Sequence, residues 1–194
     1  MAKGRIDQTK DDEDALITTF SRSEGIGQQK ASANQAKTNY EAIKQHLDFW
    51  NAAKTGPVQQ QHVALDENSE NFKAYNLGYH DNSYLKLGKD AFKDEKALAN
   101  TLTHEASHGK LKTLDHAYEG APYFLNLSDN ISLDNADHYK FGVELAHKEV
   151  DVDHAKQVQG SDILQKVGKA RDLAYFRANK IWLFLMWTKD AYNG

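Results

Sequence analysis

The chain of 194 residues contains no cysteine, so disulfide bonds and thiolate metal sites are excluded. Any bound metal must therefore be held by His, Asp or Glu side chains. The sequence also lacks a strong excess of one charge, and a formal net charge of -4 gives no electrostatic basis for binding nucleic acid or an anionic membrane. Long apolar runs are missing too, because the longest one, residues 181–187, is far too short to span a bilayer. We predict a soluble protein with no nucleic-acid partner and no membrane insertion.

The N-terminal residues lack the apolar segment of a secretory signal peptide, since acidic residues 11–14 follow soon after the first basic ones. Residues 1–30 are polar and predict a flexible leader, although Leu16, Ile17 and Phe20 would allow it to dock on the rest of the chain. Residues 31–194 have the length and apolar content of a single domain.

Apolar residues recur at helical spacing in four segments, 33–54, 94–108, 135–150 and 162–187. Asp94 is a suitable N-cap for the second of these helices, and Gly109 is a stop signal at its end. Residues 75–79 alternate between large and small or polar side chains, and residues 84–87 look like a second short strand. The order of helix, small sheet and further helices predicts an α+β fold that is mostly α.

The helix predicted over 94–108 carries an H-E-x-x-H sequence, His104-Glu105-Ala106-Ser107-His108. Residues four apart lie on one face of a helix, so His104 and His108 are able to bind the same Zn²⁺ ion. Glu105 then lies about 100° around the helix from His104, where its carboxylate would reach a water activated by the metal. This spacing predicts a zinc-dependent hydrolase.

A catalytic zinc ion needs a third protein ligand and an open position for water. The position at which one family of zinc peptidases has a third histidine is Leu114 here, which argues against that family. Glu144 on a later helix is one candidate, and His116 is another. Asp115, in a segment that follows the motif helix closely, is the nearest candidate, and Tyr118 would then be placed to hydrogen-bond an oxyanion.

The segment 112–119, K-T-L-D-H-A-Y-E, resembles the G-T-x-D-x-x-Y-G element of the aspzincin metallopeptidases, the deuterolysin and peptidyl-Lys endopeptidase group. Thr, Asp and Tyr are kept, whereas Lys112 and Glu119 replace the two glycines. Segment 133–139, L-D-N-A-D-H-Y, resembles a later motif of the family, and segment 84–88 resembles the strand before its active-site helix. The resemblance covers roughly residues 70–146.

This resemblance implies a zincin-type catalytic domain over 31–194, with the active-site helix next to a small antiparallel sheet, and a zinc endopeptidase that cleaves proteins or peptides. It assigns one catalytic Zn²⁺ to the ligands His104, His108 and Asp115, with Glu105 as general base and Tyr118 as hydrogen-bond donor in the transition state. An edge strand near 75–79 or 84–87 would bind the substrate by strand addition.

Asp137 matches a substrate-binding acid of the lysine-specific members. Those members carry a second acid where this chain has Lys140, so lysine specificity is not predicted. A helix N-cap role for Asp134, Asn135 or Asp137 is an equally good interpretation of this segment.

Two other functions fit the same motifs: a zinc amidase or peptidase that acts on cell-wall peptides, and a non-catalytic interaction module on a zincin scaffold. The lack of cysteines and of a signal peptide suits a bacterial toxin or effector, secreted or delivered without a signal peptide. A cognate inhibitor or immunity protein would be the partner of such a toxin.

Overall fold

The computed structural model describes residues 1–22, 24–52, 63–66, 74–77, 84–92, 94–121 and 123–150. Within these ranges the α-helices are α1 (Ala2–Asp11), α2 (Glu13–Phe20), α3 (Ile26–Ala52), α4 (Glu95–Leu111), α5 (Asp129–Leu133) and α6 (Ala136–Ala146). The strands are β1 (Val63–Asp66), β2 (Ala74–Leu77) and β3 (Tyr84–Gly88), and the 3-10 helices are η3 (Lys89–Phe92) and η4 (Phe124–Asn126). The fold is thus α+β and mostly helical, as predicted. The helix predicted over 162–187 lies outside the described residues.

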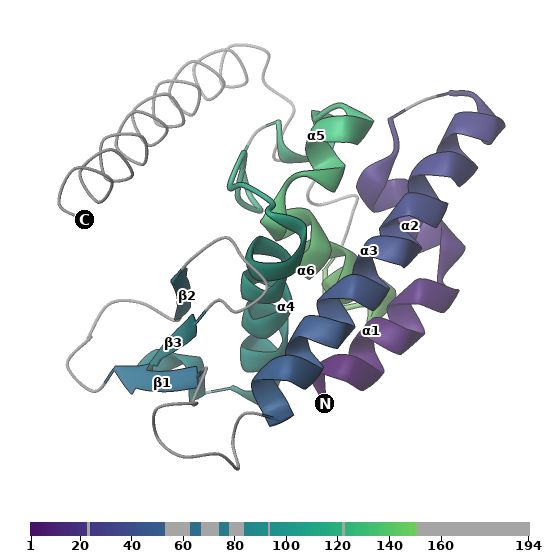
Figure 1. The fold of residues 1–194 in the computed structure, drawn as a ribbon. Coiled ribbons are helices and arrows are strands. Elements are labelled where there is room, and N and C mark those ends of the chain that lie inside the picture. The colour runs from purple at the N-terminus through teal and green to yellow at the C-terminus, as the bar shows by residue number, and fades with distance from the viewer. Residues whose placement is uncertain are drawn as a thin grey trace, which may run out of the picture.

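The helical elements surround α4, which carries the H-E-x-x-H sequence. Figure 1 shows α4 between the small sheet on one side and α3 on the other, with α6 crossing close by. Helices α3 and α6 both pack on α4, and β2 contacts it from the sheet side. Among the described residues, no helix is long and apolar enough to cross a membrane.

The N-terminal residues pack into the protein, which is the docked alternative that Leu16, Ile17 and Phe20 allow for residues 1–30. They form α1, α2 and the first turn of α3, and Ile6, Leu16 and Phe20 are fully buried in the main core cluster. Asp12 caps α2 by accepting a hydrogen bond from the backbone N–H of Ala15. The composition of the segment is misleading because a few apolar residues at helical spacing are sufficient to bury one face of each helix.

Helix α4 begins as predicted, since the Asp94 side chain accepts a hydrogen bond from the backbone N–H of Lys96 at 2.9 Å. It does not stop at Gly109, which is a buried residue within the helix. The helix continues to Leu111 and ends at Lys112, whose φ of 64° and ψ of 26° are left-handed. The family resemblance has a glycine at this position, and glycine is the residue that adopts this conformation without strain.

The sheet has the strand order β1-β3-β2 and is mixed. Strands β2 and β3 pair antiparallel, as predicted for 75–79 and 84–87, whereas β1 pairs with β3 in parallel. The prediction of an antiparallel sheet is therefore wrong for the β1–β3 pair. No alternation of apolar and polar residues predicted β1, and such a pattern does not specify the direction in which a strand pairs. Strand β3 is central, so the prediction that 84–87 could be an edge strand is wrong, and within the described ranges β1 and β2 are the edges.

The α3–α6 contact depends on one glycine. Tyr40 on α3 is fully buried, and its hydroxyl donates a hydrogen bond to the backbone carbonyl of Tyr139 on α6 at 2.7 Å. A Cβ atom at Gly142, one turn further along α6, would overlap the Tyr40 hydroxyl oxygen. The small residue leaves room on α6 for the Tyr40 hydroxyl, which reaches it from α3.

Candidate metal centre

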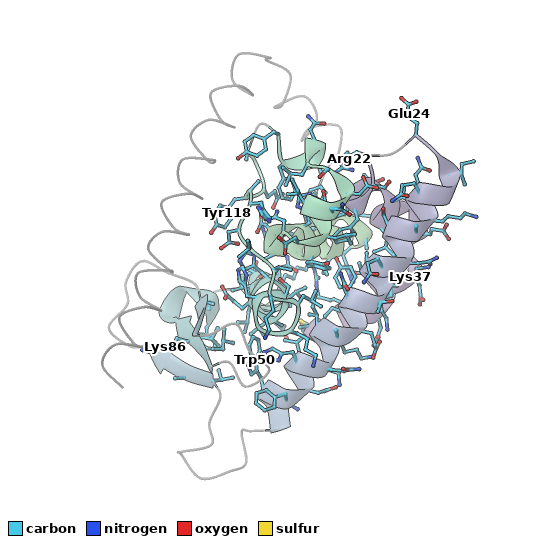
Figure 2. All side chains as sticks on the ribbon, turned by 45° about the horizontal axis from the view of Figure 1, so that its top comes forward. Arg22, Glu24, Lys37, Trp50, Lys86 and Tyr118 are labelled. Carbon is cyan, nitrogen blue, oxygen red and sulfur yellow. The ribbon has the colours of Figure 1, made fainter. Side chains whose placement is uncertain are left out.

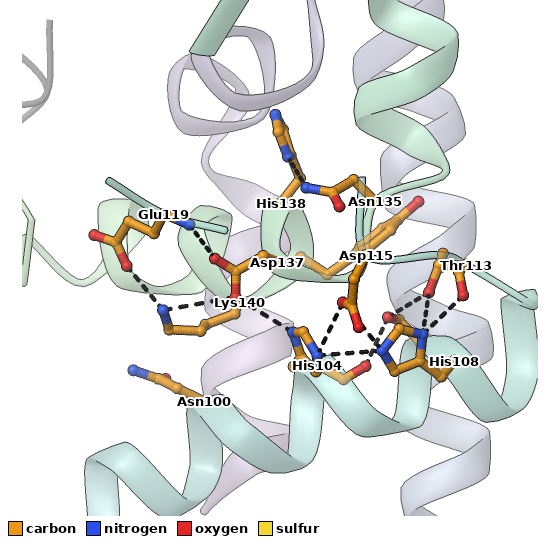
Figure 3. Close-up of polar contacts among 12 residues, drawn as sticks. Asn100, His104, His108, Thr113, Asp115, Glu119, Asn135, Asp137, His138 and Lys140 are labelled. Carbon is orange, nitrogen blue, oxygen red and sulfur yellow. Dashed lines mark hydrogen bonds and ion pairs between the residues drawn. The ribbon is translucent and has the colours of Figure 1, made fainter. Parts of the chain in front are cut away.

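Three of the predicted ligands converge in the structure. The Nε2 atoms of His104 and His108, on successive turns of α4, lie 3.2 Å apart. The Oδ1 atom of Asp115 lies 3.4 Å from the His104 Nε2 and 3.3 Å from the His108 Nε2. All three potential ligand atoms are within 4.8 Å of one another, so this group could hold a metal ion. Figure 3 shows the two imidazoles pointing from α4 toward the Asp115 carboxylate.

The outer nitrogen of His108 is bound to the backbone. His108 Nδ1 lies 2.7 Å from the carbonyl oxygen of Thr113, which only accepts hydrogen bonds, so Nδ1 is the donor. In the neutral imidazole this places the lone pair on Nε2, facing His104 and Asp115. Ser107 supports the arrangement, because its hydroxyl donates to the His104 carbonyl at 2.7 Å and accepts from the Thr113 hydroxyl at 2.8 Å.

The outer nitrogen of His104 faces a carboxylate. His104 Nδ1 lies 3.3 Å from Asp137 Oδ1, which acts as an acceptor, and this contact also leaves the lone pair on Nε2. The other oxygen of Asp137 accepts a hydrogen bond from the backbone N–H of Glu119. Burial raises the pKa of Asp137. The contacts with His104, Lys140 and this N–H lower it by more, so the pKa lies below its ordinary value. Asp137 is therefore ionised at neutral pH.

Asp115 is placed by contacts between its segment and the start of α6. Leu114 forms a parallel bridge with Asn135, in which the Leu114 N–H donates to the Asp134 carbonyl and the Leu114 carbonyl accepts from Ala136. The Asn135 side chain is fully buried, and both ends of its amide form hydrogen bonds. Its Oδ1 accepts from the backbone N–H groups of residues 116 and 117. Its Nδ2 donates to the Ala117 carbonyl and to Nδ1 of residue 138. Asn135 occupies the N-cap position of α6 but makes no capping hydrogen bond with its side chain. Its amide instead connects α6 to the segment that carries Asp115.

From the sequence, Asn135 is a candidate N-cap, and no local pattern indicates that it holds this segment. One feature of the sequence is consistent with this role. Asn135 is an uncharged amide within the 133–139 motif segment, and an Asn side chain offers two donors and two acceptor lone pairs in a small volume.

The electrostatics of the three residues favour a cation. Burial lowers the pKa of His108, but the Asp115 carboxylate and the Glu105 charge raise it to about 9. Burial raises the pKa of Asp115, but His108, His104 and Tyr118 together lower it. The site therefore keeps a proton between His108 and Asp115 at neutral pH, and a metal cation at the same place would displace it.

The residues present fit a metal ion by a further observation. Asp115 Oδ1 is buried and has no donor in hydrogen-bonding geometry among the described residues. Such an oxygen is costly unless a cation compensates it, and without a metal the protonated His108 at 3.3 Å is that cation. Two imidazoles and one carboxylate form an N/O ligand set with the number and chemistry of a catalytic zinc site.

Glu105 and Tyr118 differ in exposure beside this group. Glu105 is 6% exposed and follows His104 on α4, and its charge acts on His108. Tyr118 is 53% exposed, and its ring lies nearly parallel to that of His104, with centroids 6.3 Å apart and an interplanar angle of 16°. Figure 2 shows Tyr118 on the side of the molecule away from Lys37 of α3. The tyrosine thus borders the site from the solvent side.

The two other candidate ligands are engaged elsewhere. The Glu144 carboxylate accepts a hydrogen bond from the Asn100 side chain at 2.9 Å and lies 3.7 Å from the Lys140 ammonium. His116 Nε2 contacts the Asp134 carboxylate at 2.7 Å. Neither belongs to the group of converging ligand atoms, so the structure brings Asp115 to the two histidines in preference to both.

Comparison of the chain with protein-family models, with curated proteins and with solved structures gave no match.

Proposed function

We propose that the protein is a zinc-dependent endopeptidase that hydrolyses peptide bonds with Glu105 as general base. The observation that carries this proposal is the convergence of His104 Nε2, His108 Nε2 and Asp115 Oδ1 within 4.8 Å, next to Glu105 on the same helix. A chain without cysteine that holds two imidazoles and one carboxylate in this way offers the donor set of a catalytic zinc, with a position left for water.

Zinc, when bound, lowers the pKa of a coordinated water toward ~7 and polarises the substrate carbonyl. The Glu105 carboxylate accepts a proton from the attacking water as the water oxygen bonds to the carbonyl carbon. It then delivers this proton to the amide nitrogen as the C–N bond breaks, so that one water is consumed and an acid and an amine are released. The burial of Glu105 keeps bulk water from competing for the proton.

Tyr118 supplies the second group that the reaction needs. Its half-exposed phenol borders the ligands on the solvent side, where a substrate carbonyl would arrive. A hydroxyl in that place donates a hydrogen bond to the oxygen that becomes negative in the transition state. The peptide itself would lie along the edge of β2, since β2 is an edge strand and packs against α4.

The experiment is the substitution Glu105→Gln, assayed for cleavage of casein. We expect turnover to fall by about 10²- to 10⁴-fold because the amide cannot take the proton, while zinc content stays at one equivalent. Glu95→Gln, at the exposed first turn of the same helix, is the matched control and should retain full activity.

Unchanged proteolysis by Glu105→Gln would refute the mechanism. A wild-type protein that binds zinc and cleaves purified peptidoglycan but not casein would favour an amidase instead. A protein that takes up no zinc on reconstitution would favour a non-catalytic module.

A further inference from the structure

Asp137 differs from an ordinary surface acid in how completely its carboxylate is used. It is 4% exposed, and Figure 3 shows it between His104 on one side and Glu119 and Lys140 on the other. Oδ1 contacts His104 Nδ1 at 3.3 Å and lies 3.7 Å from the Lys140 ammonium, and Oδ2 accepts the Glu119 N–H. Each oxygen therefore already has a donor from within the protein.

These contacts leave little for a substrate to bind. A substrate ammonium group would have to displace Lys140, whose own charge is held by Glu119 at 2.8 Å as well as by Asp137. It would also have to enter a buried place at a cost in desolvation. The geometry argues against direct recognition of a substrate side chain by this carboxylate.

The same contacts suit a different role. A histidine ligand commonly donates its outer N–H to a carboxylate or a carbonyl, which fixes the tautomer and the orientation of the ring. His108 has such a partner in the Thr113 carbonyl, at 2.7 Å. Asp137 Oδ1 occupies the equivalent place behind His104.

We propose that Asp137 is a positioning residue of the metal centre, which holds His104 with its proton on Nδ1 and its Nε2 lone pair toward the metal, and that it is not a substrate-binding residue. This inference rests on the proposed metal site. The Asp137 carboxylate of α6 would then orient His104, and the Thr113 carbonyl, just after α4, orients His108.

The substitution Asp137→Asn tests the role because an amide cannot reproduce both contacts. If the amide oxygen takes the Glu119 N–H, the NH₂ group faces His104 Nδ1 and favours the tautomer with its proton on Nε2, where a metal would bind. If the amide is turned the other way, its NH₂ group opposes the Glu119 N–H instead. Either orientation weakens the support of His104.

The measurement is the Zn²⁺ dissociation constant, obtained by competition with a chromophoric chelator for the folded wild-type protein and its variants. We expect Asp137→Asn to bind Zn²⁺ about 10- to 100-fold more weakly than the wild type. The control is Asp48→Asn, which removes a carboxylate from the Lys3–Asp48 pair between α1 and α3, away from the ligands, and should bind Zn²⁺ as the wild type does.

A Zn²⁺ dissociation constant of Asp137→Asn within twofold of the wild type, accompanied by a higher KM, would overturn the proposal in favour of substrate binding. Failure of the wild type itself to bind Zn²⁺ would overturn the proposed function together with this inference.

A second readout needs no variant. In a long-range ¹H–¹⁵N spectrum of the zinc-loaded wild type, we expect His104 to carry its proton on Nδ1. A proton on Nε2 of His104 would also overturn the proposal.

Discussion

At the scale of single residues, the candidate site is an arrangement of small polar groups that each use their hydrogen bonds for orientation. The Asn135 amide joins α6 to residues 116 and 117 through three hydrogen bonds, and the hydroxyls of Ser107 and Thr113 connect α4 to the turn that follows it. Each such bond contributes about 1 kcal/mol of stability, and their larger effect is to leave one position for Asp115.

Lys112 is the residue at which this arrangement is strained. Its φ of 64° is left-handed, which costs a side-chain-bearing residue about 1 kcal/mol, while its ammonium donates to the Gly109 carbonyl at 2.7 Å. We predict that Lys112→Gly raises the free energy of unfolding by about 0.5–1 kcal/mol in urea titrations.

Lys112→Ala is the control for this prediction, since it removes the ammonium and keeps the strain, and it should not stabilise the protein. Equal stability of the glycine and alanine variants would show that the left-handed turn stores no strain.

The sequence was informative about the chemistry of these residues and less so about their partners. The H-E-x-x-H spacing places two imidazoles on one face because helical geometry is local, so His104 and His108 are predictable from sequence. Asp115 was one of several candidates until contacts with α6 positioned it. Asp137 was interpreted from a resemblance, and its neighbour His104 is on another helix, a proximity that no local pattern encodes.

At the scale of elements, α4 is held by α3 and α6, and the Tyr40 side chain of α3 reaches α6 at Gly142. Replacing an interior helical glycine with alanine ordinarily stabilises a helix by up to about 1 kcal/mol. At Gly142 the sign should reverse, because the new methyl group overlaps the Tyr40 hydroxyl. We predict that Gly142→Ala lowers the free energy of unfolding by about 1–3 kcal/mol.

Two further variants make the prediction specific. Gly4→Ala on α1 is the control, since nothing lies within 4 Å of its added Cβ, and it should be neutral or stabilising. In a Tyr40→Phe background the cost of Gly142→Ala should be smaller, because the obstructing oxygen is gone. An equal cost in both backgrounds would show that the contact with Tyr40 is not what requires glycine.

The elements also show where periodicity is a limited guide. Helices α3, α4 and α6 and strands β2 and β3 follow from patterns within each segment. The helical state of residues 2–20 was missed because few apolar residues, Ile6 and Leu16 among them, bury α1 and α2 within the common core. The parallel pairing of β1 with β3 depends on contacts between distant segments, which no single-segment pattern specifies.

At the scale of the whole molecule, a buried neutral histidine links stability to pH. His138 is fully buried against Phe124, with ring centroids 4.1 Å apart, and burial together with the Arg22 charge lowers its pKa to about 3. Below pH 6.5 His138 becomes protonated in the unfolded chain but stays neutral in the folded protein until the pH falls to about 3. The contribution of His138 to stability is therefore complete above pH 6.5 and is lost progressively as the pH falls toward 3.

We predict that His138 lowers the free energy of unfolding by up to about 1.4 kcal/mol per pH unit between pH 6.5 and 4.5. Glu144, whose pKa burial raises to about 8, acts in the opposite direction over this range, so the effect of His138 is measured as the difference between two proteins. His138→Gln can still accept from the Asn135 amide, and its stability should fall less, relative to the wild type, as the pH is lowered in urea unfolding with a chelator present. Parallel curves for the two proteins would mean that His138 is not held neutral in the fold.

The identity of the metal ligands is best determined in a crystal structure of the zinc-loaded protein, with the ion located by anomalous scattering. We expect one zinc ion held by His104 Nε2, His108 Nε2 and an Asp115 carboxylate oxygen, with His104 Nδ1 donating to Asp137. A zinc ion bound through Glu144 or His116 in place of Asp115, or no ion between the two histidines, would contradict this expectation.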